Sequence, residues 1–186
     1  MIIRKATPGD AEFVAKYLLL AMEEIVCLFI GSKDTVRAAE FMLRFVQQEN
    51  NQYSYQNCWV AEIDGEVVAA ANVYDGARLY ELRKPVTEHI GKEFNQHFKP
   101  EEETQAGEYY IDSLGVNTIY RGQGVGSKVL RYLIAEYVFK QHGTLGLLVD
   151  AENPDARRLY LKLGFKVVAQ KLIFGKSMEH LQLTSC

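Results

Sequence analysis

A short glycine-rich segment between two regular stretches places the strongest constraint on what this chain can fold into. The segment Tyr120–Lys128 reads Tyr-Arg-Gly-Gln-Gly-Val-Gly-Ser-Lys. It follows an alternating stretch, 108–116, which predicts a strand, and it leads into apolar residues at four-residue spacing, which predict a helix: Val125, Val129, Leu133 and Tyr137. Glycines turn backbone N–H groups toward one point without a Cβ in the way, and a helix N-terminus is partly positive. The segment therefore predicts a cradle for an anion such as a phosphate. A tight turn that only begins a helix is the alternative.

Two common nucleotide-binding patterns do not fit this segment. A Walker loop needs Gly-Lys-Ser/Thr at its end, whereas Ser127 separates Gly126 from Lys128 here. A Rossmann loop needs G-x-G-x-x-G near the start of its domain, whereas these glycines are spaced G-x-G-x-G and come after more than half of the chain. The segment therefore favours neither a Walker nor a Rossmann type of nucleotide-binding loop.

The rest of the chain predicts alternating helices and strands in one domain over residues 1–186. A strand is expected over 1–6, helices over 11–30 and 33–48, and a hairpin over 58–63 and 66–74 with Asp64-Gly65 as its turn. Residues 75–107 are polar and irregular, and we expect them to form an excursion with one or two short helices. A strand (108–116), a helix (125–142), a strand (144–149), a helix from Asn153 to Gly164 and strands over 165–174 and 179–183 follow. This order predicts a mixed α/β sheet.

Composition and charge exclude several classes of protein. With 48% apolar and 24% charged residues, the chain has the composition of a globular domain. Its net charge of 21 − 24 = −3 argues against a nucleic-acid partner. No apolar run is long enough to predict a membrane span, so we expect a cytoplasmic protein without a membrane partner. The three cysteines, Cys27, Cys58 and Cys186, lack C-x-x-C spacing and predict free thiols, and the four histidines lack the spacing of metal ligands. No metal is expected.

Three motifs in the second half of the chain occur in an order typical of one family. They are Arg121-x-x-Gly124-x-Gly126 after the strand Ile111–Val116, the segment Asp150–Tyr160, and Leu163-Gly-Phe165. With these, the sequence resembles the GNAT superfamily of N-acetyltransferases. The resemblance implies a central, mostly antiparallel twisted sheet, splayed at the cofactor site and flanked by helices.

The resemblance also implies a binding site for acetyl-coenzyme A. In the family, the loop binds the pyrophosphate through backbone N–H groups, which here belong to Arg121, Gly122, Gln123, Gly124, Val125, Gly126 and Ser127. A bulged strand holds the thioester carbonyl and the pantetheine arm, which implies roles for the backbone of Leu114, Gly115 and Val116. Asn153 and Ala156 at the start of the last helix complete the implied set. A glycine at 115 that only relieves crowding in a buried strand is the alternative reading.

Transfer of an acetyl group to an amine needs a base for the amine proton and an acid for the departing thiolate. Tyr160 corresponds to the general acid of the family, although a core tyrosine with a satisfied hydroxyl is the alternative. Asp112 and Glu108 alternate onto one face of their strand, and either is a candidate base, whereas solvated or ion-paired carboxylates are the alternative. Ser113 lacks the motif of a nucleophilic serine, and so we expect direct transfer within a ternary complex.

The sequence leaves the acceptor and the functional class open. The two early helices and residues 75–107 are expected to form the acceptor pocket, where acidic residues either attract a cationic amine or form a solvated loop: Glu93, Glu101, Glu102 and Glu103. The leading prediction is acetyl transfer to a primary amine of a small molecule or peptide. The alternative is a non-catalytic module that binds or senses acyl-coenzyme A. Homodimers are common among similar proteins, so a homodimer is a further expectation.

Overall fold

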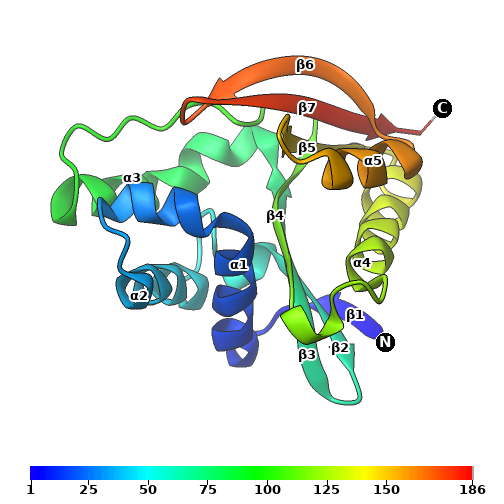
Figure 1. Cartoon of the computed structure of the whole chain (residues 1–186), viewed down its shortest axis with the longest axis horizontal. Helices are drawn as coiled ribbons and strands as arrows, with labels where there is room; N and C mark the ends of the chain where they lie inside the picture. The colour runs from blue at the N-terminus through cyan, green and yellow to red at the C-terminus, as the bar shows by residue number, and fades with distance from the viewer. Residues whose placement is uncertain (186) are drawn as a thin grey trace.

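The computed structural model describes residues 1–185, which form one seven-stranded sheet with helices on both faces (Figure 1). The strand order is β1-β2-β3-β4-β5-β7-β6, and only β4 and β5 pair in parallel. The strands are β1 (Ile2–Lys5), β2 (Cys58–Ile63), β3 (Glu66–Asp75), β4 (Tyr109–Val116), β5 (Thr144–Asp150), β6 (Lys166–Ile173) and β7 (Lys176–Thr184). The mixed, mostly antiparallel sheet expected from the sequence is confirmed.

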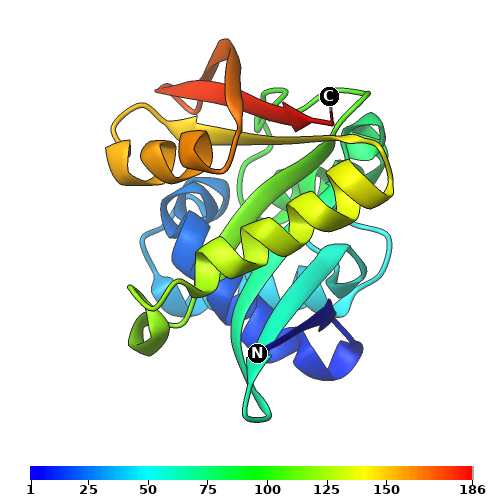
Figure 2. The same cartoon turned by 90° about the vertical axis from the view of Figure 1, so that its right-hand side faces the viewer.

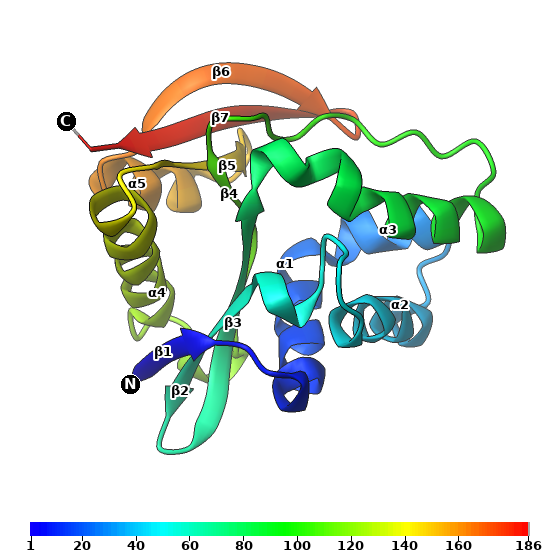
Figure 3. The same cartoon turned by 180° about the vertical axis from the view of Figure 1, so that it is seen from behind.

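Two apolar cores cover the two faces of the sheet. On one face lie α1 (Ala11–Ile30), α2 (Thr35–Gln47) and α3 (Leu79–Glu93). On the other lie α4 (Val125–Leu133), its continuation 134–140 and α5 (Pro154–Lys162). Figure 1 shows these two groups on opposite sides of β4, and Figure 3 shows α3 and α2 from behind. None of the helices in residues 1–185 is both long and apolar enough to cross a membrane.

Local signals in the sequence account for most element ends. Asp34 accepts hydrogen bonds from the backbone N–H groups of Val36 and Arg37 and so begins α2. Asp64 and Gly65 have φ values of 52° and 84°, which two-residue hairpin turns require, and the predicted β2–β3 hairpin is confirmed. Gly164 at φ 100° ends α5.

The predicted helices differ from the structure in two places. Residues 75–107 contain a three-residue 3-10 helix, Gly76–Arg78, followed by the α-helix α3, which continues through Pro85 and, at 15 residues, is longer than the short helices expected. Leu82, Val86 and Ile90 recur at helical spacing and are buried, so tertiary packing outweighs the missing hydrogen bond at the proline. The helix expected over 125–142 is α-helical only to Leu133, and then continues with π-helical spacing over Ile134–Lys140.

The chain between α3 and β4, residues 94–107, is irregular and is called the strap below. In Figure 3 it runs from the end of α3 back to β4, passing close to the β6–β7 turn. Lys171 of β6 donates to the carbonyl oxygens of Glu102 and Glu103, both at 3.2 Å, and so fixes the strap against the β6–β7 hairpin. Cys27 and Cys58 have free thiols, as predicted, and Cys186 lies outside the described residues.

Candidate active site

The sheet is open between β4 and β5. These strands pair only at Tyr109–Leu145, Tyr110–Gly146 and Ile111–Leu147, near the start of each strand. Figure 2 shows them meeting at one end and diverging toward the other. The edge of β4 from residue 112 to residue 116 therefore has no strand partner on the β5 side.

Backbone N–H groups of β4 point into this opening. The N–H group of Asn117 donates to Val68 O of β3 at 2.8 Å. Because successive N–H groups of a strand alternate between its two edges, those of Gly115 and Ser113 also face β3. The N–H groups of Leu114 and Val116 consequently face the open edge, where they are available to a bound molecule.

The glycine-rich segment lies beside that edge. Gly122 and Gly124 have φ values of 76° and 77°, in the left-handed region that favours glycine. Gly126 is close enough to Val116 that an added Cβ would lie 3.6 Å from Val116 Cγ2. The first turn of α4 therefore starts next to the open edge of β4.

No side chain caps the N-terminus of α4. Within residues 1–185, no hydrogen-bond acceptor is recorded for the N–H groups of Val125, Gly126 and Ser127. Unpaired N–H groups and the helix dipole make this end of α4 suited to an anion, as the sequence predicts. Arg121 and Gln123 are exposed at its rim, and Gln123 Nε2 donates to Ile119 O at 2.9 Å.

The bulge of β4, which the resemblance implies, lies at Asp112, and Gly115 lies outside it. The pairing with β3 shifts between Asn72–Ser113 and Val73–Ile111, which leaves Asp112 as the extra residue. Gly115 pairs in regular register with Ala70. A Cβ at Gly115 would lie 1.7 Å from the carbonyl oxygen of Tyr17, so this glycine allows the backbone of α1 to pack directly on β4. The alternative reading of Gly115, relief of crowding, is the one that its contacts support.

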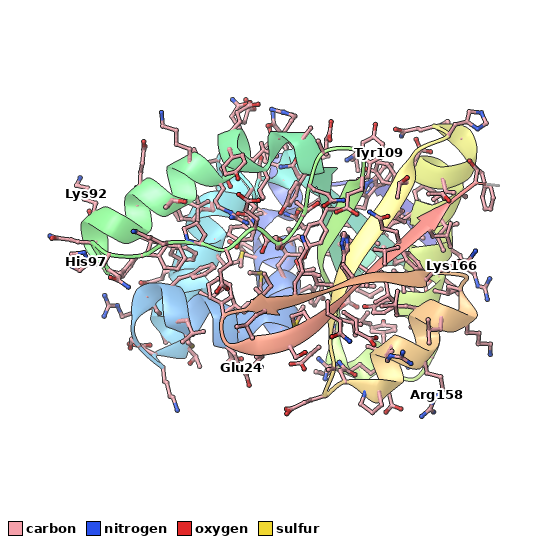
Figure 4. The ribbon with its side chains drawn as sticks, turned by 90° about the horizontal axis from the view of Figure 1, so that it is seen from above. Glu24, Lys92, His97, Tyr109, Arg158 and Lys166 are labelled. Carbon is pink, nitrogen blue, oxygen red and sulfur yellow. The ribbon has the colours of Figure 1, made fainter. Side chains whose placement is uncertain are left out.

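Helix α5 lies on the opposite side of the opening, and two of the predicted site residues, Asn153 and Tyr160, belong to it or to its cap. Asn153 Oδ1 accepts a hydrogen bond from Ala156 N at 3.1 Å and caps the helix, as predicted. Tyr160 is half-buried, with its ring edge-on to Phe165 at 6.0 Å. Burial raises the pKa of Tyr160, and no hydrogen bond from its hydroxyl to residues 1–185 is recorded. Arg158 of the same helix points away from the sheet (Figure 4).

Asp112 lies in a buried polar cluster on the α3 side of the sheet. Its Oδ1 atom accepts hydrogen bonds from Gln52 Nε2 at 3.0 Å and from the Tyr74 hydroxyl at 3.3 Å. The same two donors reach Glu103 Oε1 of the strap, at 2.7 Å and 3.1 Å, and Arg83 Nη2 pairs with that oxygen at 2.7 Å. Burial and then the negative charge of Glu103 raise the pKa of Asp112 to about 7, against the opposing effects of Gln52, Arg83 and Tyr74.

Glu108, the second candidate base, lies in a different environment. Its side chain is fully buried and accepts hydrogen bonds from the Thr104 hydroxyl at 2.7 Å and Gln182 Nε2 at 2.8 Å, with His180 Nε2 at 2.9 Å. Burial alone would raise the pKa of Glu108, but these hydrogen bonds outweigh it and the pKa is lowered. Gly146 makes room for the carboxylate, since a Cβ there would lie 1.9 Å from Glu108 Oε2. The structure therefore separates Asp112, beside the open edge, from Glu108, whose carboxylate is enclosed.

Sequence reasoning missed the partners of Asp112. Gln52, Tyr74 and Arg83 belong to a loop, a strand and a helix far apart in the chain, and no local pattern links them. The run Glu101–Glu103 leaves two interpretations open in the sequence, and that of a solvated loop is wrong for Glu103, whose side chain is only 15% exposed. A lone arginine in an apolar helix face, Arg83, was the one available signal of a buried acidic partner.

The comparisons with known proteins identify the family of this chain. Residues 22–165 match the model of the acetyltransferase (GNAT) family. An acetyltransferase of Agrobacterium fabrum is 35% identical over 81 residues, which cover 42% of this chain and 58% of that protein. The N-alpha-acetyltransferase RimI of Mycobacterium tuberculosis is 36% identical over 61 residues, 33% of this chain and 37% of that protein. The chain thus spans between about a third and three fifths of the length of these curated relatives.

Solved structures resemble the chain over its whole length. A crystal structure described as an acetyltransferase superposes with a TM-score of 0.79 at 30% identity and covers 99% of both chains. An N-acetyltransferase from Staphylococcus aureus has the same fold, with a TM-score of 0.77 at 21% identity, over 98% of this chain and 100% of that one. Because the family model matches more than half of the residues, this chain belongs to the acetyltransferase (GNAT) family.

Proposed function

We propose that the protein is an acetyl-coenzyme A dependent N-acetyltransferase that transfers the acetyl group directly to a primary amine of a small molecule or peptide, within a ternary complex. The observation that carries the proposal is the meeting of three features at one opening of the sheet. These are the uncapped N-terminus of α4, the outward N–H groups of Leu114 and Val116, and Asp112 at the bulge.

Acetyl-coenzyme A, the group that the family implies, fits the residues present. The N–H groups of Val125, Gly126 and Ser127 have the position and polarity to bind a diphosphate, and Gly122 and Gly124 keep the loop backbone free of Cβ atoms. The open edge of β4 offers Leu114 and Val116 as donors to an extended amide-containing arm, in the manner of an added strand. When bound, the thioester supplies the acetyl group.

Asp112 is the residue that we propose as the base. A pKa raised to about 7 leaves a useful fraction of its carboxylate ionised near neutral pH while keeping its affinity for a proton high. It accepts one proton from the ammonium form of the amine, and this makes the nitrogen lone pair available for attack on the acetyl carbonyl. The buried hydrogen bonds of Glu108 instead suit a structural role that holds Thr104 of the strap to β4 and β7.

Tyr160 is the residue that we propose as the acid. Its raised pKa keeps its hydroxyl protonated at neutral pH, and its proton can pass to the sulfur as the carbon–sulfur bond breaks. As the amide forms, the nitrogen loses its second proton to solvent, and Tyr160, which gave its proton to the sulfur, regains one from solvent. The proton on Asp112 returns to solvent, so the step needs no covalent enzyme intermediate.

A single experiment tests the proposal. The purified chain, acetyl-coenzyme A and a panel of primary amines are mixed, and release of free thiol is followed alongside the mass of the acetylated amine. Turnover of at least one amine, together with binding of acetyl-coenzyme A that is weakened by substitutions in residues 122–127, is expected. Binding without turnover of any amine or peptide would instead identify an acyl-coenzyme A sensor, and absence of binding would refute both functions.

A further inference from the structure

We propose that Glu103 of the strap is a positioning residue for the transfer reaction, and that Lys171 of β6, by holding the strap in place, keeps Glu103 beside Asp112. Under the proposed function, on which this inference rests, Asp112 is the base, and Glu103 acts through it without touching the reacting atoms. Asp112 belongs to the sheet and Glu103 to an irregular segment, so their contact couples the position of that segment to the proposed base.

Asp112 and Glu103 compete for the same protons. Gln52 Nε2 carries two protons and lies 2.7 Å from Glu103 Oε1 and 3.0 Å from Asp112 Oδ1, so it can donate one proton to each carboxylate. The Tyr74 hydroxyl has a single proton, and its oxygen lies 3.1 Å from Glu103 Oε1 and 3.3 Å from Asp112 Oδ1. A proton that Tyr74 donates to Glu103 is withheld from Asp112. The carboxylate form of Asp112 then lacks a stabilising hydrogen bond, which raises its affinity for a proton.

Glu103 also places a negative charge beside Asp112. The titratable groups that face Asp112 come from the strap, α3, the loop before β2, and strands β2, β3 and β4: Glu103, Arg83, Tyr53, Cys58, Tyr74 and Tyr110. Burial raises the pKa of the three tyrosines and of the cysteine, so these four groups are neutral near pH 7. Within this set, Glu103 is the negative charge that disfavours ionisation of Asp112, and Arg83 is the positive charge that opposes it.

The strap is attached to the rest of the fold through side chains. No backbone-to-backbone hydrogen bond is recorded for residues 99–107 in the described part of the chain. Lys171 Nζ donates to the carbonyl oxygens of Glu102 and Glu103 and so fixes the main chain at Glu103 from the side of β6. Arg83 Nη2 holds the carboxylate of the same residue from α3, at 2.7 Å. Because Lys171 lies outside the buried polar cluster, a substitution there can displace Glu103 without changing any group of the cluster.

Removal of Lys171 separates two effects of opposite sign. If Lys171 holds the strap, Lys171→Met lets Glu103 move away, Tyr74 donates to Asp112, and the pKa of Asp112 falls. If Lys171 acts only through its positive charge, its removal makes the carboxylate form of Asp112 less favourable, and the pKa rises. The direction of the shift therefore distinguishes placement of the strap from simple electrostatics.

The test titrates Asp112 in the intact protein. NMR of isotopically labelled aspartate carboxyl groups follows the ionisation without any need for turnover, and Asp112→Asn assigns the signal. We expect the pKa of Asp112 to be lower by at least about half a pH unit in Lys171→Met and also lower in Glu103→Gln, with matching shifts in the acidic limb of kcat/KM. Lys166→Met is the matched control, because Lys166 is an exposed lysine at the start of the same strand, away from the strap (Figure 4). This control should leave the pKa of Asp112 unchanged.

A double variant shows whether Lys171 acts through Glu103. Lys171→Met should shift the pKa of Asp112 less in the Glu103→Gln background than in the parent, because the charge to be displaced is already absent. The melting temperature of each variant reports whether it is folded. An unchanged or raised pKa of Asp112 in folded Lys171→Met, or an equal shift in the double variant, overturns the inference. If the titration shifts as expected but the parent acetylates no amine or peptide, the proposed function fails and the coupling between the strap and Asp112 stands.

Discussion

Asp112 and Glu103 accept hydrogen bonds from the same two donors, Gln52 Nε2 and the Tyr74 hydroxyl, although one carboxylate belongs to a strand and the other to the strap. A negative charge beside a buried carboxyl group makes its ionisation less favourable. Arg83 pairs with Glu103 at 2.7 Å, and burial and then the charge of Glu103 raise the pKa of Asp112. Tyr53, Tyr74, Tyr110 and Cys58 also face this cluster, and burial raises the pKa of each, so they stay neutral near pH 7.

The first prediction concerns pH. Because Asp112 must be ionised to accept a proton, kcat/KM should fall tenfold per pH unit below an apparent pKa of about 7. Glu103→Gln removes a negative charge beside Asp112, which lowers its pKa and should move this limb to lower pH. Profiles measured from pH 5 to pH 9 at saturating acetyl-coenzyme A test both statements, with Glu102→Gln as the matched control. If the acidic limb of the kcat/KM profile lies at the same pH in Glu103→Gln as in the parent, the group that ionises there is not Asp112.

A second prediction separates stability from activity at Asp112. Its pKa is higher in the folded chain than its ordinary value of 3.8, so folding favours the protonated form and stability is lost as the pH rises through about 4 to 7. Asp112→Asn mimics the neutral form. Its unfolding free energy should exceed that of the parent at pH 8, and this advantage should fade toward pH 4, while kcat falls about a hundredfold. Urea titrations at the two pH values check the sign, and a variant less stable than the parent at pH 8 would contradict it.

Tyr160→Phe should lower kcat about a hundredfold, because the thiolate would leave without a proton from this side chain. The ring and its contact with Phe165 are retained, so acetyl-coenzyme A affinity, measured by calorimetry, should not change. Tyr132→Phe is the control, since Tyr132 is another half-buried tyrosine, on α4, whose ring packs on Trp59. Equal rates for the two variants would exclude Tyr160 as the acid.

Glu108→Gln should destabilise the fold by about 1–3 kcal/mol while leaving the acidic limb of the pH profile in place. The amide cannot accept from Thr104, His180 and Gln182 as the carboxylate does. Since the pKa of Glu108 is lowered below its ordinary value of 4.5, the stabilisation is complete above about pH 4.5 and is lost as the pH falls through the folded pKa. Denaturation at pH 7 and pH 3 measures this difference. Loss of the acidic limb in this variant would make Glu108 the base instead of Asp112.

Gly115→Ala should destabilise the protein by about 3 kcal/mol or more, because its Cβ would overlap the carbonyl oxygen of Tyr17 and push α1 away from β4. Gly126→Ala is a control for stability alone, since its Cβ would make ordinary contacts at 3.6 Å and 3.9 Å. Denaturant midpoints distinguish the two variants. Equal denaturant midpoints for the two variants would show that α1 can move away from β4 without a loss of stability.

The sequence predicted the features that short stretches encode. The turn at Asp64-Gly65, the cap at Asn153 and the left-handed glycines before α4 each depend on neighbours within a few residues, and their positions follow from local chemistry. The position of the bulge at Asp112 does not follow from local chemistry. It depends on how β3 pairs with β4, and the paired residues lie about 40 positions apart in the chain. Burial of Glu103 depends on Arg83 and Lys171, which the chain brings to the strap only after folding. The residue roles in transfer stay predictions that the variants above examine.

The contact between Gly115 and Tyr17 makes the wall between the two halves of the site a single strand thick. One side of that wall meets α4 and α5, and the other meets α1, α3 and the strap. Under the proposed function, substitutions in the strap or α3 would therefore change which amine binds and leave the residues proposed to hold acetyl-coenzyme A, on the far side of β4, unchanged. Acceptor specificity could then diverge through residues 79–107 alone, with the same acetyl donor retained.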